Sequence, residues 1–313
     1  LSKPFPLLMY SLSGASASIM PERLALTPDN VPVKEMIGSG PYRFIADKWV
    51  SGSQVVYEKF NDYVPRTDGV ASNTAGPKIA HVTDIKWQVI NDRATAVAAL
   101  QNNEVDGIEA VDNDFIPVLR KDPAITLVKA ALPAISIMRF NHLYPPFDNV
   151  LMRRAILAVV NQTEYMTAAN GSEFPEYWHD KVGVWVPGTP MASTAGLEKL
   201  TGKRDFALAR SLIKESGYKG EPIVLLDPVD SPKHHASALV TADLFKKLGL
   251  KVDLRSMDWG SYLQRRNSQE PPATGGWHVG FTAMTGTSNL DPTSNLGIRG
   301  TGKQAWFGWP TNP

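Results

Sequence analysis

The chain has no cysteine, and this absence excludes several kinds of chemistry at once. Without thiols there are no disulfide bonds, thiolate zinc sites, iron–sulfur clusters or cysteine nucleophiles. Long apolar runs are also missing. The longest, 155–160, has six residues, whereas a membrane-spanning helix needs about 20. The sequence therefore predicts no membrane-spanning helix.

The chain also lacks an excess of charge of either sign. Lys and Arg number 32 and Asp and Glu 31, which gives a formal net charge of +1. A general nucleic-acid-binding protein needs a basic surface, so this class is disfavoured. The hydrophobic fraction of 43% over 313 residues is enough for a real core, and the length suggests two domains.

Strand and helix patterns alternate along the chain, which predicts a mixed α/β fold. Residues 40–45 and 54–60 have the composition of a strand pair, with a turn at 50–53. Asp92 is a good N-cap for the helix that follows it. In this half of the chain we expect further strands at 81–90, 125–129 and 134–141, and helices at 93–102, 113–119 and 148–169. Asp148 is the expected cap of the last of these helices.

The second half of the chain contains a βαβ pattern. Residues 222–226 and 251–256 are expected strands, and 234–248 is the helix between them. Such a crossover is right-handed and makes the two strands parallel. We also expect a long loop at 170–203, helices at 206–216 and 259–267, and a strand at 277–284.

Candidate catalytic and metal-binding groups are few. His179-Asp180 is a possible acid/base pair, but no nucleophile motif accompanies it. His234 and His235 are adjacent on an expected helix and point about 100° apart, so they are poorly placed to share a metal, and we expect both to be exposed. The basic pairs 153–154 and 265–266 are expected to be solvated or paired with local carboxylates. We therefore expect no metal and no cofactor.

Aromatic residues are concentrated near the end of the chain. Five fall within 33 residues, namely Trp277, Phe281, Trp306, Phe307 and Trp309. Gly275-Gly276 precedes the first of them, and a polar run, 285–289, follows Met284. Aromatic side chains most often fill a core, but flat amphipathic side chains beside such loops are also typical of ligand pockets.

Several stretches, taken in order, resemble one protein family. They are Gly38–Tyr42 followed by Trp49, Gly52 and 61–63; then 103–106, Phe140-Asn141, 145–148, 153–156, 209–218 and 245–252. In this order and spacing the chain resembles the extracellular solute-binding proteins of family 5, which serve ABC importers of peptides, nickel and related solutes. The resemblance spans residues 38 to 292.

The resemblance implies a non-catalytic receptor with an α/β, two-lobed periplasmic-binding-protein-like architecture. It would capture a peptide-like or other small solute between its lobes and deliver it to ABC permease subunits in the membrane. The location implied is periplasmic or extracellular, after export. The alternatives are a hydrolytic enzyme that uses His179 and Asp180, or a ligand-sensing or interaction module without a transport role.

Family members are considerably longer, so the resemblance implies a chain incomplete at both termini, without its signal peptide. Residues 1–136 would be part of lobe I, and 137–313 would be lobe II without its C-terminal return to lobe I. The hinge would lie near Ile135–Asn141, and Arg139 and Asn141 are the expected hinge residues.

The ligand site is expected at the carboxyl end of the last strand, since open α/β sheets bind ligands there. The strand 277–284 would run toward the cleft between the lobes, and the loop 285–291 would line it. The expected ligand-binding residues are Trp277, Phe281, Met284, Thr285, Asn289, Asp291 and Trp306. Peptide-binding members commonly carry an Asp before this turn, where this chain has Thr285 and Gly286, so the ligand's identity stays open.

Overall fold

The computed structural model describes residues 2–13, 19–28, 31, 33–72, 75–129, 132–290, 292 and 295–311. The chain forms two compact units: Leu1–Ser16 with Thr126–Pro313, and Ala17–Ile125. This division falls upstream of the boundary at 136/137 that we expect between the lobes. The assignment of residues to lobes stays a prediction.

The smaller unit is built on a three-stranded antiparallel sheet. Its strands β1 (Tyr42–Phe44), β2 (Gln54–Lys59) and β3 (Asp84–Gln88) are neighbours in this order, and the predicted hairpin is confirmed. The predicted cap is confirmed as well: the Asp92 carboxylate accepts a 2.7 Å hydrogen bond from the Thr95 amide. The helices of this unit are α2 (Glu22–Ala25), α3 (Arg93–Gln101) and α4 (Ile116–Leu119), with 3₁₀ turns at Ala46–Lys48 and Asn113–Phe115.

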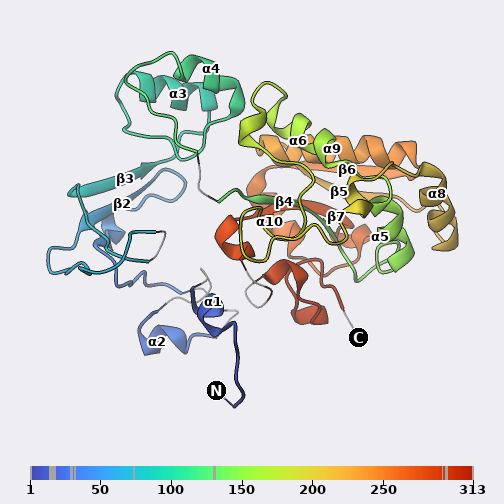
Figure 1. Cartoon of the computed structure of the whole chain (residues 1–313), viewed down its shortest axis with the longest axis horizontal. Coiled ribbons are helices and arrows are strands. Elements are labelled where there is room, and N and C mark those ends of the chain that lie inside the picture. Colours follow the sequence, from blue (N-terminus) through green and yellow to red (C-terminus); the bar gives the residue numbers. More distant parts are fainter. Residues whose placement is uncertain are drawn as a thin grey trace. The chain divides into compact units, whose positions relative to one another are not determined.

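The larger unit contains a four-stranded mixed sheet with the order β4-β7-β5-β6 (Figure 1). Its strands are β4 (Ile135–Phe140), β5 (Ile223–Pro228), β6 (Val252–Met257) and β7 (Val279–Met284). Strands β5 and β6 are parallel and joined through α9 (Pro232–Lys247), so the predicted βαβ unit is confirmed. Strand β4 runs antiparallel to β7.

Helices cover one face of this sheet. They are α5 (Val150–Leu157), α6 (Gln162–Asn170), α8 (Phe206–Glu215) and α9, which share one apolar core with the strands. Helix α10 (Trp259–Arg266) and the C-terminal aromatic residues form a second core with the other face. The remaining elements are α1 (Leu8–Ser13), α7 (Glu198–Thr201) and 3₁₀ turns at Pro175–Tyr177, Pro272–Thr274, Gly286–Asn289, Leu296–Ile298 and Gly302–Gln304.

Strand β5 shows why its sequence is apolar without alternation. Ile223 and Leu225 belong to the core under the helices, while Val224 and Leu226 belong to the second core. Successive side chains of a strand point to opposite faces. Because both faces are covered here, all four of these positions are apolar, as is usual for buried parallel strands.

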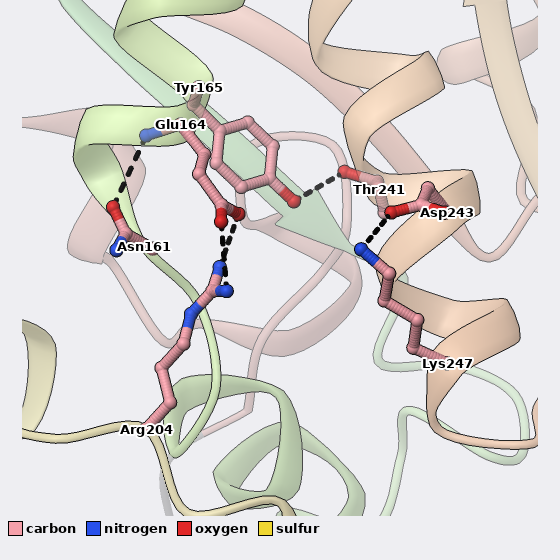
Figure 2. A network of polar contacts seen from close by, with 7 residues as sticks. All are labelled: Asn161, Glu164, Tyr165, Arg204, Thr241, Asp243 and Lys247. Carbon is pink, nitrogen blue, oxygen red and sulfur yellow. Dashed lines mark hydrogen bonds and ion pairs between the residues drawn. The ribbon is translucent and has the colours of Figure 1, made fainter.

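Three sequence predictions fail, and they concern a helix, its cap and a strand. The helix expected at 148–169 is broken into α5 and α6, because Asn161 caps a new helix through a 3.2 Å hydrogen bond from the Glu164 amide to its side chain (Figure 2). Asn149, and not Asp148, caps α5 by accepting from the Leu151 amide. Residues 125–129, expected as a strand, run as coil.

The long segment 171–203 is held against α6 by polar contacts. The Gln162 side chain exchanges two hydrogen bonds with the backbone of Val182, at 2.8 and 2.9 Å. At the far end of the segment, the guanidinium of Arg204 makes a bidentate ion pair with Glu164 (Figure 2). The same figure shows Tyr165 reaching across to Thr241 of α9, where the two hydroxyls are 2.8 Å apart. Helix α6 therefore links this loop to the core.

Strand β5 is the place where the fold is most sensitive to lost volume. Leu225 is fully buried, and Leu225→Ala should lower the free energy of unfolding by about 2–5 kcal/mol, through lost burial and a cavity. The measurement is urea unfolding. Leu208→Ala on α8, where the leucine is 47% exposed, is the matched control and should cost far less. Equal losses in the two variants would contradict this core.

Two partly or fully buried histidines lie beside the sheet. His278 accepts a 2.8 Å hydrogen bond from the Val224 amide at Nδ1, and its Nε2 lies 3.0 Å from the Pro145 carbonyl. This pattern needs the neutral ring with its proton on Nε2. Burial lowers the pKa of His278. Burial, together with the nearby charges of Arg153 and Arg139, lowers the pKa of His142 to about 4.

The His142 ring makes stability depend on pH. An unfolded chain binds the proton near pH 6.5, while the folded ring resists it until about pH 4. The free energy of unfolding should therefore be intact above pH 6.5 and fall as the pH is lowered toward 4. In the His142→Gln variant, the free energy of unfolding should fall less between pH 7.5 and 4 than it does in the unsubstituted protein. Urea unfolding at a series of pH values measures this. The same pH slope in both proteins would count against this assignment.

Candidate functional site

The candidate site lies on the sheet face opposite the four covering helices. On β4, Met138 and Phe140 pack against the helix-side core. Because side chains alternate along a strand, Arg139 between them points to the other face. Its side chain is nevertheless buried, with a residue exposure of only 8%.

The guanidinium of Arg139 is held by backbone carbonyls. Nε donates to the Phe307 carbonyl at 2.7 Å and Nη1 to the Gly297 carbonyl at 2.5 Å. The Trp306 ring centroid lies 5.5 Å from Cζ. Burial lowers the pKa of Arg139 to about 10, so the group is still a cation at neutral pH. Its Nη2 atom is buried and has no hydrogen-bond partner within the described structure.

Two asparagines continue this arrangement. The Asn289 Oδ1 atom accepts from Asn295 Nδ2 at 2.7 Å, and Asn295 Oδ1 accepts from the Gly297 amide at 2.8 Å. Both side chains are almost completely buried. Arg139, Gly297, Asn295 and Asn289 thus form one connected set, which we call the Arg139 network. Asn289 Nδ2 is its second buried donor for which the described residues supply no acceptor.

Gly297 allows the parts of the network to come close together. A Cβ atom at this position would lie 3.1 Å from Asn295 Oδ1 and 3.2 Å from Met284 Sδ, which is tighter than ordinary contacts. The same atom would be 4.0 Å from the Trp306 ring. Met284 and Trp306 therefore lie directly beside the network.

A second arginine, Arg266, is partly buried on the same side of the sheet. The Arg266 guanidinium stands 4.5 Å from the Phe307 ring centroid, and its Nη1 is 3.5 Å from Thr282 Oγ1. Its Nε atom is also buried without a partner in the described part of the chain. Burial lowers the pKa of Arg266.

The expectation that the basic pairs are solvated or neutralised is wrong for three of their four members. Arg266 lies against Phe307, and Arg265 donates to the Gly276 carbonyl at 3.0 and 3.2 Å. Arg153 donates to the carbonyls of Phe147 and Asp148. Of the pairs, only Arg154 is exposed. Long apolar stems allow arginine to be buried in this way.

The structure brings some of the predicted ligand-binding residues together. Asn289 is part of the Arg139 network, and Met284 and Trp306 lie beside it. The resemblance marks Arg139 itself as a hinge position. Thr285 is exposed, and its hydroxyl lies 3.0 and 2.9 Å from those of Thr287 and Ser288. Asp291 lies outside the described residues.

Other predicted residues make packing contacts. Phe281 belongs to the core under the helices, on the face opposite Arg139. Trp277 is fully buried, with its ring 6.1 Å from Phe307 and 6.0 Å from Trp309. Asn141, the second hinge residue, is fully buried and braces the end of β4, because it donates to the Trp277 carbonyl and accepts from the Leu143 amide.

The sequence reasoning missed Asn295, Gly297 and Arg266. An Asn followed two residues later by Gly indicates a turn, and Asn295 does cap the 3₁₀ turn at 296–298. Nothing in that signal shows that the carbonyl of Gly297 accepts a hydrogen bond from Arg139, which lies 158 residues earlier in the chain. The Arg139 network is a long-range arrangement that sequence spacing does not reveal.

The candidate acid/base groups do not form a nucleophile relay. His179 is exposed, and Asp180 accepts a 2.6 Å hydrogen bond from Thr163. A second acidic group is more suggestive: buried Asp227 lies 2.6 Å from His235 Nδ1, and it accepts from Ser256 at 2.8 Å. Here the serine donates to the carboxylate and not to the imidazole, so the histidine cannot activate it.

The expectation that His234 and His235 are both exposed is also wrong. Each is half-buried. The His234 ring stacks on Trp259 with centroids 5.0 Å apart, and His235 pairs with Asp227. No group of three or more His, Asp or Glu side chains within the described ranges is arranged to hold a metal ion. Nor is any described helix both long and apolar enough to cross a bilayer.

A hollow of about 450 Å³ lies elsewhere on the larger unit, between residues 145–149 and 216–221. Two of its polar side chains, Asn149 and Glu221, make structural hydrogen bonds. Asn149 caps α5 and donates to the Ser216 carbonyl, and the Glu221 carboxylate accepts from the Lys219 amide. We therefore place the candidate site at the Arg139 network.

Curated relatives of this chain are named as binding proteins. The chain is 29% identical over 315 residues to a Sinorhizobium fredii protein named a probable peptide ABC transporter periplasmic-binding protein, covering 100% of this chain and 59% of that one. It is 26% identical over 297 residues to a glutathione-binding protein of Pectobacterium atrosepticum, covering 92% and 53%. The chain thus spans between half and three fifths of these relatives' lengths.

Solved structures show the same fold. A periplasmic binding protein from A. tumefaciens R10 in complex with agropinic acid superimposes with a TM-score of 0.69 at 21% identity, over 100% of this chain and 58% of that one. A Campylobacter jejuni protein in complex with Ni(L-His) gives 0.68 at 16% identity, over 100% and 60%. These likenesses confirm the predicted α/β, periplasmic-binding-protein-like fold.

The family comparison agrees with the motifs read from the sequence. Residues 1–298 match the model of the bacterial extracellular solute-binding proteins, family 5. The match covers nearly all of the 313 residues. The chain therefore belongs to the bacterial extracellular solute-binding proteins, family 5.

Proposed function

We propose that the full-length protein is the substrate-binding component of an ABC importer, which captures a small solute and delivers it to permease subunits in the membrane. The observation that carries this proposal is the family match over residues 1–298. The Sinorhizobium relative, named for a peptide transporter, supports a peptide-like or other small solute. Its name also supports a periplasmic or extracellular location.

The proposed role is binding without catalysis. The relatives named above are binding proteins, not enzymes. The acid groups of the larger unit support the same view, because neither Asp180 nor Asp227 is linked through a histidine to a hydroxyl nucleophile in the described structure. His179 and Asp180 are accordingly left out of the proposed site.

We assign solute contact to the Arg139 network and the residues beside it. Asn289 and Arg139 offer buried hydrogen-bond donors, and Met284 and Trp306 offer apolar and aromatic surface next to them. A few convergent polar groups beside an apolar wall are what small-molecule sites require. Thr285, exposed at the end of β7, adds a hydroxyl.

The lobe assignment is part of the proposal. Residues 1–136 would contribute to lobe I and 137–313 to lobe II, with Arg139 and Asn141 at the hinge. The division of the chain into two compact units before β4 supports a boundary in this region. Motion about such a hinge needs only a few residues to change their backbone angles.

Ligand-induced stabilisation tests the function. The full-length protein should be screened by thermal unfolding against glutathione, alanylalanine and nickel with L-histidine, and purified protein should be examined by native mass spectrometry for a co-purified solute. A solute at a hundredfold excess over Kd should stabilise the fold by about 2.7 kcal/mol. A protein that carries no solute and responds to none of these probes would contradict the proposal.

The role of Asn289 gives a sharper test. Asn289→Ala should weaken binding of the solute found in that screen by about 1–3 kcal/mol, because a buried hydrogen bond is lost. Asn267→Ala is the matched control, since that asparagine is exposed at the end of α10 in the same unit. Unchanged affinity in the Asn289 variant would remove this side chain from the site.

A further inference from the structure

The Arg139 network has a surplus of donors. Arg139 Nη2 and Asn289 Nδ2 are buried, and neither finds an acceptor anywhere in the described structure. The acceptor atoms of the network are already used, since Asn289 Oδ1 and Asn295 Oδ1 each accept a hydrogen bond from within it. A buried donor without a partner is destabilising, because it loses its hydrogen bonds to water and gains none in return. Whatever completes the network must therefore bring acceptors.

The network also carries a positive charge that no acidic side chain among the described residues neutralises. The two contacts of Arg139 are backbone carbonyls, which accept hydrogen bonds but have no net charge. No Asp or Glu of the described residues lies within ion-pair distance of Arg139 or of Arg266. Buried cations in proteins are normally paired, because desolvation of an isolated charge is costly.

The geometry fixes where the missing group must bind. Two nitrogens of Arg139 are held by Phe307 and Gly297, so the planar guanidinium cannot turn and its Nη2 keeps one direction. The turn at Asn295 and Gly297 joins this donor to the Asn289 amide through direct hydrogen bonds. The Trp306 ring, which also lies against the guanidinium, leaves an aromatic surface beside it.

We propose that this site selects solutes with a carboxylate group, which Arg139 Nη2 and Asn289 Nδ2 bind. The inference rests on the proposed function and adds the chemical class of the solute to it. A carboxylate brings two acceptor oxygens and one negative charge, which matches two free donors and one unpaired guanidinium. A free amine would bring a second positive charge and no acceptor, so the site disfavours solutes that present only an amine.

Matched pairs of probes test the carboxylate directly. Binding to the full-length protein should be measured by thermal shift and calorimetry for glutathione against its diethyl ester, alanylalanine against its amide, and succinate against succinamide, with inorganic phosphate as a separate anion. We expect at least one carboxylate to bind and its masked partner to bind about tenfold or more weakly. Native mass spectrometry should find a co-purified solute of the same class.

Variants connect the selectivity to the network. Arg139→Gln should reduce carboxylate binding about tenfold or more and bring the two members of a pair close together in affinity. Arg139→Lys keeps the positive charge and should retain part of the preference for the carboxylate over its masked partner. This result would show that the loss in Arg139→Gln is a defect of binding and not of folding. Arg154→Gln removes an exposed arginine of α5 and should change nothing. Melting temperatures of the unliganded variants report on folding.

The outcomes separate this inference from the proposed function. Equal binding of the acid and its masked partner, tighter binding of phosphate than of any carboxylate, or a carboxylate preference that survives in Arg139→Gln would overturn the inference while leaving solute binding intact. Failure of every probe, together with the absence of any co-purified solute, would overturn both. A carboxylate preference that disappears with Arg139 supports both.

Discussion

The alternation of side chains along β4 is the constraint on which the rest of the account depends. Met138 and Phe140 join the core under the helices, and this fixes Arg139 on the other face of the sheet. Burial of a guanidinium on that face then requires fixed acceptors, which the C-terminal segment supplies through the carbonyls of Gly297 and Phe307. One strand register thus couples the packing of the larger unit to the placement of its candidate site.

Local signals in the sequence predicted the elements that depend on local chemistry. The cap at Asp92, the hairpin of β1 and β2, and the parallel pair joined by α9 are all confirmed. The break between α5 and α6 was missed, because the apolar pattern runs on to Val160 and only the side-chain hydrogen bond of Asn161 shows where the new helix begins. Asp148 and Asn149 are both suitable N-cap residues, so residue type alone does not show that Asn149 is the one that caps α5.

The sequence pattern predicted part of the candidate site but not the contacts that hold it together. Met284, Asn289 and Trp306 were chosen as residues beside a polar loop, and the structure adds what the pattern could not, the long-range contacts that join them to Arg139. Trp277 and Phe281 were chosen by the same aromatic pattern, yet their contacts are with the cores. Residue type does not distinguish an aromatic side chain in a core from one at a ligand, because both need a large apolar surface. The partly buried Arg266 was missed because an arginine pair on a helix usually faces solvent.

The central claim is that the Arg139 network is completed by a solute and not by the protein itself. The most direct measurement is a crystal structure of the full-length protein with the solute it carries when purified. The account predicts an anionic oxygen of that solute about 2.7–2.9 Å from Arg139 Nη2, within reach of Asn289 Nδ2 as well. A carboxylate of the protein's own chain in that position, or a solute bound away from Arg139, would contradict it.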